Sequence, residues 1–374
     1  MKYYIIAGEA SGDLHGSNLV KEIFRIDKNA IIRAWGGEKM MDAGATVIKN
    51  YKDLSFMGFY EVILNLNTIL KNIRFCKSDI KKFNPNKIIL IDYPGFNLRI
   101  AKWAKKNNFF VNFYIAPQIW AWKESRIDII KKYIDRLYVI LPFEKNYFKN
   151  KHNYKVKYLG HPIMDSIKNF NNTDNKKSFL EKNKIDDNRK IIAILPGSRK
   201  QEIRKILKIM LNVIGNFSDY QFIIAGVPNI KKNFYRSIIK DFDVKMVENQ
   251  TYDLLSNSSA ALVTSGTATL ETALFKVPQV VCYKTSLISF FLAKIFVKIK
   301  YISLVNLIVG REIIKELVQS RCTKNNIINE LTQVLKKRNA LTIKKNYDEL
   351  ISLIGSFGTS KRIATDIINK KNWN

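Results

Sequence analysis

Short apolar runs alternate with longer amphipathic stretches along most of this chain. In the first half, the apolar runs occupy 3–7, 31–35, 87–92, 109–115 and 137–141. Helical patterns lie between them, at about 16–27, 60–83, 96–107 and 123–134. Continuous apolar strands that alternate with helices are typical of a parallel sheet covered on both faces. The pattern therefore predicts an α/β fold.

A polar segment rich in Asn and Lys at 165–190 divides this pattern into two parts. Apolar runs resume at 190–195, 221–225, 244–247, 260–264 and 279–283, and helical patterns close the chain. We therefore predict two doubly wound, Rossmann-like domains facing a cleft. The first spans 1–168 and is completed by C-terminal helices at 340–374, and the second spans 186–339. Ligands of such sheets bind beyond the carboxyl ends of the strands.

The charge of the chain has two interpretations. Its 374 residues include 63 Lys plus Arg and 32 Asp plus Glu, a net charge of +31. Such an excess attracts an anionic membrane, a nucleic acid or a phosphorylated substrate. The excess is nearly all Lys, and Lys, Asn and Ile share A/T-rich codons, so mutational drift explains the same composition. With 47% hydrophobic residues, a disordered chain is excluded.

The cysteines and histidines predict neither a disulfide framework nor a metal site. Cys76, Cys282 and Cys322 are scattered, which fits a reducing compartment. The three histidines, His15, His152 and His161, have no metal-ligand spacing with acidic residues.

Neither a signal peptide nor a transmembrane helix is expected. The first apolar run is too short and is followed by acidic residues, and no stretch reaches about 18 apolar residues. Two apolar stretches, 58–73 and 287–299, fit either a helix packed on the protein core or a helix in a membrane interface. In the first of them the apolar residues at helical spacing include Val62, Ile63, Leu66, Ile69 and Leu70.

Two polar turns follow strands in the first half. AGEASGDLHG (7–16) permits close approach of a ligand, but it is not the dinucleotide fingerprint, so a nicotinamide cofactor is unsupported. It carries Glu9, Ser11 and His15. In IDYPGFN (91–97), Asp92 ends a strand and is placed to act as a general base. Capping and turn formation explain the same residues without chemistry.

Two turns in the second half suit a phosphate. LPGSRKQEIR (195–204) joins a strand to a helix through Ser198 and Arg199. TSGTATLE (264–271) repeats the arrangement with Ser265, Gly266 and Thr267, and Glu271 follows one turn later, where it can accept the ribose hydroxyls of a nucleotide. Helix N-termini and Arg attract phosphate. Ordinary N-capping is the alternative, and no P-loop is present.

Taken together, these segments resemble the lipid-A-disaccharide synthases, inverting glycosyltransferases of the B-type fold with two Rossmann-like domains. The matching stretches occur in family order over about 3–335. Besides the four turns above, they are FMGFYEV (56–62), YIAPQIWAW (114–122), LPFEK (141–145), GHPIMD (160–165) and SLVNLIVGREIIKEL (303–317).

The resemblance implies a function in lipid A biosynthesis in Gram-negative bacteria. The family transfers 2,3-diacylglucosamine from its UDP donor, a UDP-2,3-diacylglucosamine, to 2,3-diacylglucosamine 1-phosphate. This forms a β-1,6-linked disaccharide and UDP, without a metal or other cofactor, peripherally on the cytoplasmic face of the inner membrane. Asp92 matches the essential acidic residue, with Glu9 and His15 as alternative bases. Arg199, Glu271 and Asn306 match active-site residues.

With acylated substrates, the resemblance favours the membrane interpretation of the two apolar stretches. A UDP-sugar 2-epimerase of the same fold is the alternative function. Nucleic acid is not an expected partner, because no RNP, KH or helix-turn-helix signature is present. The oligomeric state stays open.

Overall fold

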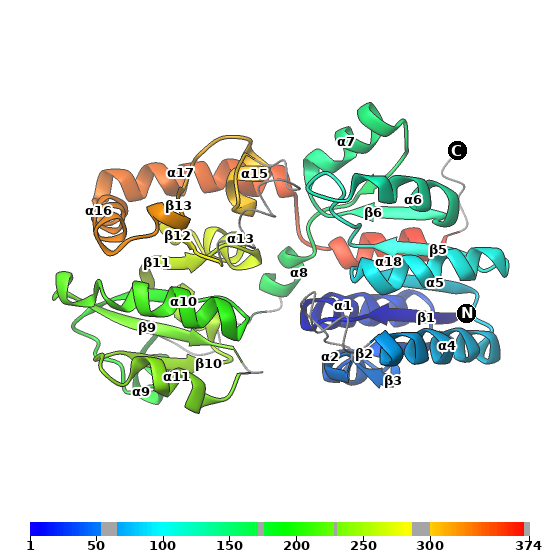
Figure 1. The fold of residues 1–374 in the computed structure, drawn as a ribbon, viewed down its shortest axis with the longest axis horizontal. Helices are drawn as coiled ribbons and strands as arrows, with labels where there is room; N and C mark the ends of the chain where they lie inside the picture. The colour runs from blue at the N-terminus through cyan, green and yellow to red at the C-terminus, as the bar shows by residue number, and fades with distance from the viewer. Residues whose placement is uncertain (54–65, 169, 171–175, 228–229, 286–299, 370–374) are drawn as a thin grey trace. The chain divides into compact units, whose positions relative to one another are not determined.

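The protein consists of two compact units in its computed structural model (Figure 1). Unit 1 comprises Met1–Asn169 and Gly355–Asn374, and unit 2 comprises Phe170–Ile354. The structure describes all residues except 54–65, 169, 171–175, 228–229, 286–299 and 370–374.

Unit 1 is built on a parallel sheet of seven strands in the order β3-β2-β1-β4-β5-β6-β7. Its elements are β1 (Lys2–Ala7), α1 (Ala10–Ile26), β2 (Ile31–Gly36), α2 (Glu38–Asp42), β3 (Thr46–Asn50), η1 (Tyr51–Asp53), α4 (Leu66–Phe83), β4 (Lys87–Ile91), α5 (Pro94–Lys106), β5 (Val111–Tyr114), η2 (Glu124–Arg126), α6 (Ile127–Tyr133), β6 (Arg136–Val139), α7 (Pro142–His152), β7 (Lys157–Tyr158), α8 (Ile163–Lys168) and α18 (Thr359–Ile368).

The apolar strands of unit 1 are buried on both faces, as their composition predicts. Tyr4 and Ile6 of β1 pack into one core together with residues of α4, α5, α6 and α7. Tyr3 and Ile5 point to the opposite face and are also fully buried. Because successive strand residues alternate between faces, one strand supplies both cores.

Unit 2 contains a parallel sheet of six strands in the order β10-β9-β8-β11-β12-β13. Its elements are α9 (Lys176–Lys182), β8 (Lys190–Leu195), α10 (Lys200–Leu211), η3 (Ile214–Asn216), β9 (Tyr220–Gly226), α11 (Lys232–Ile239), β10 (Lys245–Glu248), α12 (Thr251–Ser256), β11 (Ser258–Thr264), α13 (Thr267–Leu274), β12 (Gln279–Tyr283), α15 (Leu304–Val309), β13 (Lys315–Val318), η4 (Gln319–Arg321), α16 (Lys324–Leu335) and α17 (Lys337–Ile354).

Two cores cover the sheet of unit 2. Ile192 and Ile194 of β8 join residues of α10, α11 and α16 on one face. Ile191 and Ala193 join residues of α9 and α12 on the other. Cys282 and Cys322 belong to the first of these cores, and all three cysteines are free. This confirms the predicted α/β fold class, because each of the two units is a doubly wound domain.

Three strands were not predicted. None of β3, β7 or β13 is a continuous buried run: every residue of β3 and β7 is at least partly exposed, and β13 reads KELV. They lie at the outer positions of their sheets, where one side of the strand is unpaired. A strand at the sheet edge needs no continuous apolar sequence, which is why periodicity misses it.

The chain returns to unit 1 later than we expected. The sequence placed the return at 340, but α17 lies in unit 2, where the Tyr347 hydroxyl donates to the Val277 carbonyl oxygen. Only α18 joins unit 1, where it lies against α1 (Figure 1). Its Asp366 accepts a hydrogen bond from the Tyr138 hydroxyl at 2.9 Å and pairs with Arg136 and Lys157.

The predicted membrane-facing stretch at 58–73 is described only from α4 onward. Val62 and Ile63 lie outside the described residues, and the side chain of Leu66 is not described. Ile73 is buried in the core of unit 1, and Ile69 packs against it, so part of the apolar face covers the sheet. Leu70 is 47% exposed. The stretch 287–299 lies outside the described residues, and no helix in the described part of the chain is long and apolar enough to cross a membrane.

Candidate active site

The predicted turns lie at the point in each sheet where the strand order reverses. In unit 1 this point is between β1 and β4, and in unit 2 it is between β8 and β11. Helices leave neighbouring strands in opposite directions there, so a crevice forms beyond the carboxyl ends of the strands. Glu9, Ser11 and Asp92 follow the first pair of strands, and Ser198, Arg199 and Ser265 follow the second.

The backbone after β4 is held in an unusual conformation. Asp92 and Tyr93 both have a φ of 47°, in the left-handed region that non-glycine residues rarely adopt. The Asn97 side-chain amide donates to the Asp92 carbonyl oxygen at 2.7 Å and fixes the turn. Two consecutive left-handed residues store strain, and such strain clusters at functional sites.

Tyr93 fills the space next to the first glycine-rich turn. A Cβ on Gly8 would lie 2.4 Å from the Tyr93 ring, so only glycine fits at this position. Burial raises the pKa of Tyr93, and the charge of Glu9 raises it further, which places Glu9 beside the same ring. Glu9 is the N-cap residue of α1, and Ser11 is exposed in its first turn. The two predicted turns of unit 1 therefore meet at Tyr93.

Burial also raises the pKa of Asp92 above the usual carboxyl range. The backbone N–H of Tyr93 and the positive charge of Arg126 lower it in part. Arg126 ends η2, and its guanidinium lies 5.2 Å from the centroid of the Trp122 ring. Sequence patterns do not single out Arg126, because no motif marks a cation that reaches a strand end from a distant loop.

A buried Glu joins two of the matching segments. Glu144 in LPFEK accepts a hydrogen bond from the indole N–H of Trp120 in YIAPQIWAW at 3.1 Å. Its other oxygen accepts from the Leu141 backbone N–H at 2.8 Å. Burial raises the pKa of Glu144 to about 7, while these donors lower it. Glu144 therefore fixes the tryptophan loop to the start of α7.

His15 lies in a different group of polar residues, together with His161 and Asp165. Burial lowers the pKa of His15 to about 4, although the charge of Asp165 raises it in part. Burial also lowers the pKa of His161 to about 3, and the charge of His15 lowers it further. Both rings are therefore neutral at neutral pH. The Nδ1 of His15 is inaccessible to solvent and has no hydrogen-bond partner within the described part of the chain. The role of His15 as an alternative base stays a prediction.

In unit 2, the first phosphate-suited turn leaves Arg199 open to solvent. Arg199 is the N-cap residue of α10, and its side chain is 61% exposed. Its guanidinium lies 4.0 Å from the Glu202 carboxylate, a distance that leaves most of its donors available. Ser198 is exposed beside it. The backbone N–H groups of α10 add the positive end of a helix dipole.

The second phosphate-suited turn begins α13. Gly266, its N-cap residue, has a φ of 143°, which favours glycine. Gly266 and Thr267 are exposed. The Ser265 hydroxyl donates to the Ile302 carbonyl oxygen at 2.7 Å, so it joins this turn to the loop that precedes α15.

Glu271 is paired with a residue that the sequence did not indicate. The Tyr252 hydroxyl on α12 donates to Glu271 Oε1 at 2.8 Å. Burial raises the pKa of Glu271, and this hydrogen bond lowers it in part. The Tyr252 hydrogen bond thereby orients one oxygen of the Glu271 carboxylate.

Asn306 is committed to the protein interior. Its side-chain oxygen accepts from the backbone N–H groups of Ile313 and Ile314 at 2.8 and 3.1 Å. Its Nδ2 donates to the Ile314 carbonyl oxygen and to Glu316 at 2.9 and 2.8 Å. Since these contacts use its hydrogen-bonding capacity, Asn306 organises the loop at 303–316 in this structure. Direct contact with a substrate stays a prediction.

No group of three or more His, Cys, Asp or Glu side chains that could hold a metal ion occurs among the described residues.

Two doubly wound parallel sheets, each with polar turns at its reversal point, define the class of proteins with the B-type glycosyltransferase fold. A UDP-GlcNAc 2-epimerase from Neisseria meningitidis, solved with UDP-GlcNAc, has this fold, with a TM-score of 0.66 and 16% sequence identity over 99% of this chain and 100% of that one.

Sequence comparison identifies the particular family. The lipid-A-disaccharide synthetase family model matches residues 3–365. The lipid-A-disaccharide synthase of Syntrophus aciditrophicus is 33% identical, over 96% of this chain and 95% of its own length. That of Persephonella marina is 34% identical, over 99% and 98%. The chain belongs to the lipid-A-disaccharide synthase family, and it is a glycosyltransferase of lipid A biosynthesis.

Proposed function

We propose that this glycosyltransferase transfers 2,3-diacylglucosamine from its UDP donor to 2,3-diacylglucosamine 1-phosphate, and forms a β-1,6-linked disaccharide 1-phosphate and UDP. Family membership supports the reaction class. The observation that carries the assignment of roles is the placement of Asp92 and of Arg199 at the reversal points of the two sheets.

Asp92 acts as the base in this proposal. The 6-hydroxyl oxygen of the acceptor attacks the anomeric carbon of the donor, and Asp92 takes the hydroxyl proton. The electrons of the broken anomeric C–O bond leave with UDP. A carboxylate whose pKa is raised by burial is a stronger base than an exposed one, which supports this role.

Unit 2 binds the donor nucleotide in this proposal. Arg199 and the N-termini of α10 and α13 stabilise the negative charge that gathers on UDP, and they do so without a metal ion. Glu271, oriented by Tyr252, accepts hydrogen bonds from the ribose hydroxyls. The sites of relatives solved with UDP-sugars support a nucleotide as the ligand of this fold.

We further propose that the enzyme works peripherally on the cytoplasmic face of the inner membrane, because both substrates carry acyl chains. The outer surface of α4 supports this. Leu70 and Phe75 are each 47% exposed on it, next to the exposed basic residues Lys71 and Arg74. Apolar side chains beside cations suit an anionic lipid surface.

The test is incubation of the purified protein with the UDP-diacylglucosamine donor and the monosaccharide phosphate acceptor. We expect stoichiometric disaccharide and UDP, with and without EDTA. UDP without disaccharide would contradict the transfer, and a loss of activity with EDTA that Mg²⁺ restores would contradict the absence of a metal. Conversion of UDP-N-acetylglucosamine to its 2-epimer would instead favour an epimerase.

A further inference from the structure

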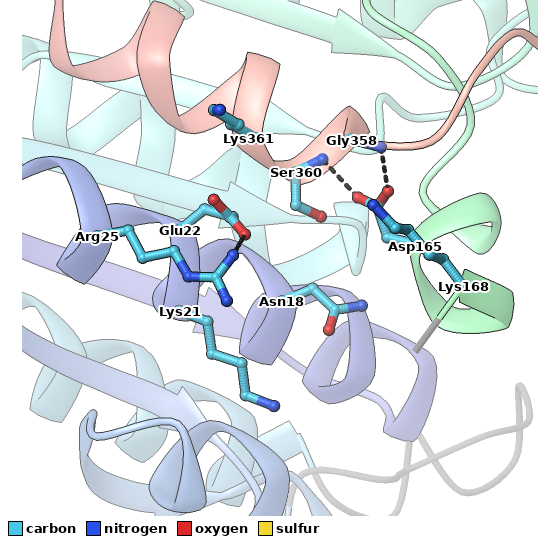
Figure 2. Close-up of a pocket in the computed structure, with 9 residues that line it drawn as sticks. All are labelled: Asn18, Lys21, Glu22, Arg25, Asp165, Lys168, Gly358, Ser360 and Lys361. Atoms are coloured by element: carbon cyan, nitrogen blue, oxygen red, sulfur yellow. Dashed lines mark hydrogen bonds and ion pairs between the residues drawn. The ribbon is translucent and has the colours of Figure 1, made fainter. Parts of the chain in front are cut away.

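A pocket of about 350 Å³ lies in unit 1 between α1, α8 and α18, apart from the residues assigned to transfer (Figure 2). Figure 2 shows side chains from all three helices around it. Its lining includes four basic residues, two acidic residues and Ser360.

The pocket lining carries more positive than negative charge. Four basic side chains, Lys21, Arg25, Lys168 and Lys361, face two carboxylates. The basic residues come from three separate helices, so the pocket gathers charges that are distant in the sequence. Lys21 and Arg25 are four residues apart on α1, which places them on the same helix face.

Both carboxylates are already engaged by the protein. Glu22 forms an ion pair with Arg25 at 2.7 Å. Asp165 accepts hydrogen bonds from the backbone N–H groups of Gly358 and Ser360 at 2.7 and 2.6 Å (Figure 2), and from that of Thr359 at 3.2 Å. The N-terminus of α18 thus takes up the charge of Asp165. The three lysines remain as the cations that are not neutralised by a carboxylate of the pocket.

A buried hydroxyl group also lines this pocket. Ser360 is 2% exposed, and its Oγ has no hydrogen-bond partner among the residues described. The Tyr114 hydroxyl is its neighbour: burial and the charge of Asp165 raise the pKa of Tyr114, and Ser360 lowers it in part. A buried hydroxyl without a hydrogen-bond partner costs free energy, and rotation of the Ser360 side chain toward the pocket would let a ligand oxygen recover it.

We propose that this pocket binds a phosphate group, carried either by a soluble metabolite or by a lipid headgroup. The lysines provide the counter-charge, and the Ser360 side chain turns toward the pocket so that its hydroxyl donates to a phosphate oxygen. This inference does not depend on the proposed transfer reaction, because none of the lining residues is assigned there to the base or to the UDP donor.

The test compares two triple variants of equal charge. Lys21→Ala/Lys168→Ala/Lys361→Ala removes the lysines of the pocket. Lys28→Ala/Lys131→Ala/Lys149→Ala removes three exposed lysines elsewhere in unit 1. Calorimetry with inorganic phosphate and glycerol phosphate measures the binding of a soluble phosphate. Flotation with phosphatidylcholine vesicles, with and without phosphatidylglycerol, measures the binding of a lipid headgroup.

We expect the triple variant of the pocket lysines to lose about tenfold in affinity in at least one of the two arms, calorimetry and flotation. The control triple variant should lose less than twofold. Ser360→Ala, which keeps the charge, should lose severalfold in the same arm, and Ser360→Cys serves in its place if Ser360→Ala does not fold. Equal behaviour of the two triples in both arms would overturn the proposal. So would unchanged binding by the Ser360 variant, which would show a general effect of surface charge instead of a site.

Discussion

The Asp165 carboxylate of α8 accepts a hydrogen bond from the Ser360 backbone N–H of α18 at 2.6 Å, across 195 positions of sequence. With the bonds from Gly358 and Thr359, it caps the helix that completes unit 1. Asp165→Asn removes the charge and turns an amide group toward donors. We expect the free energy of unfolding to fall by about 1–3 kcal/mol. Thermal or urea unfolding measures this, and the exposed Asp128→Asn should stay within about 0.5 kcal/mol of the unmodified protein.

Asp92→Asn tests the proposed base without disturbing the turn, because Asn tolerates the left-handed conformation that Asp92 adopts. We expect kcat to fall by about 10²–10⁴-fold and UDP affinity to remain unchanged. Steady-state disaccharide formation and UDP titration measure the two quantities. Glu9→Gln and His15→Asn are the comparisons. A larger loss in either one, with Asp92→Asn close to normal, would move the base to that residue.

The acid limb of the pH profile should depend on Arg126. A base must be ionised, so activity is lost as pH falls through the pKa of Asp92, which burial raises. Since the positive charge of Arg126 lowers this pKa, Arg126→Ala should move the acid limb of kcat to higher pH. Arg126→Lys keeps the charge and should restore much of the original profile. Identical acid limbs for the unmodified protein and both Arg126 variants would show that Arg126 does not act on the base.

Arg199→Ala should weaken both UDP binding and turnover. The guanidinium is largely exposed and only loosely paired, so it is available to a diphosphate. Loss of a charged hydrogen bond predicts about a tenfold decrease in UDP affinity or more, which calorimetry measures. Arg204→Ala, also on α10 and exposed, removes the same charge and should have little effect. Equal effects of the two changes would indicate a general charge effect.

Membrane attachment should depend on the exposed apolar residues of α4. Leu70→Ser/Phe75→Ser should reduce flotation with phosphatidylglycerol vesicles severalfold, because it removes apolar surface that inserts between headgroups. Leu341→Ser is the control, since Leu341 is 59% exposed on α17 of unit 2. Binding that is unchanged in the double variant would refute a role of α4 in attachment.

The sequence predicts most of this fold because the central strands are fully buried, as in β4 with its run KIILI. It also predicts the turns that carry the candidate site residues, since those turns follow directly from buried strands. It does not predict contacts that join distant segments. Three such contacts depend on the packing of loops and helices, which local periodicity does not encode. They are those of Arg126 with Asp92, of Tyr252 with Glu271 and of Trp120 with Glu144. For the same reason, the sequence could not show that the side chain of Asn306 bonds within its own loop.

The discontinuity of unit 1 sets an order for its folding during synthesis. A ribosome makes the strands of the first sheet early, but α18 only after all of unit 2. Until then, Arg136 and Tyr138 of β6 lack their partner Asp366, and the face of α1 that contacts α18 is uncovered. Such a nascent chain exposes an incomplete core while unit 2 is translated and folds. This interval is when we expect the growing chain to need protection from aggregation.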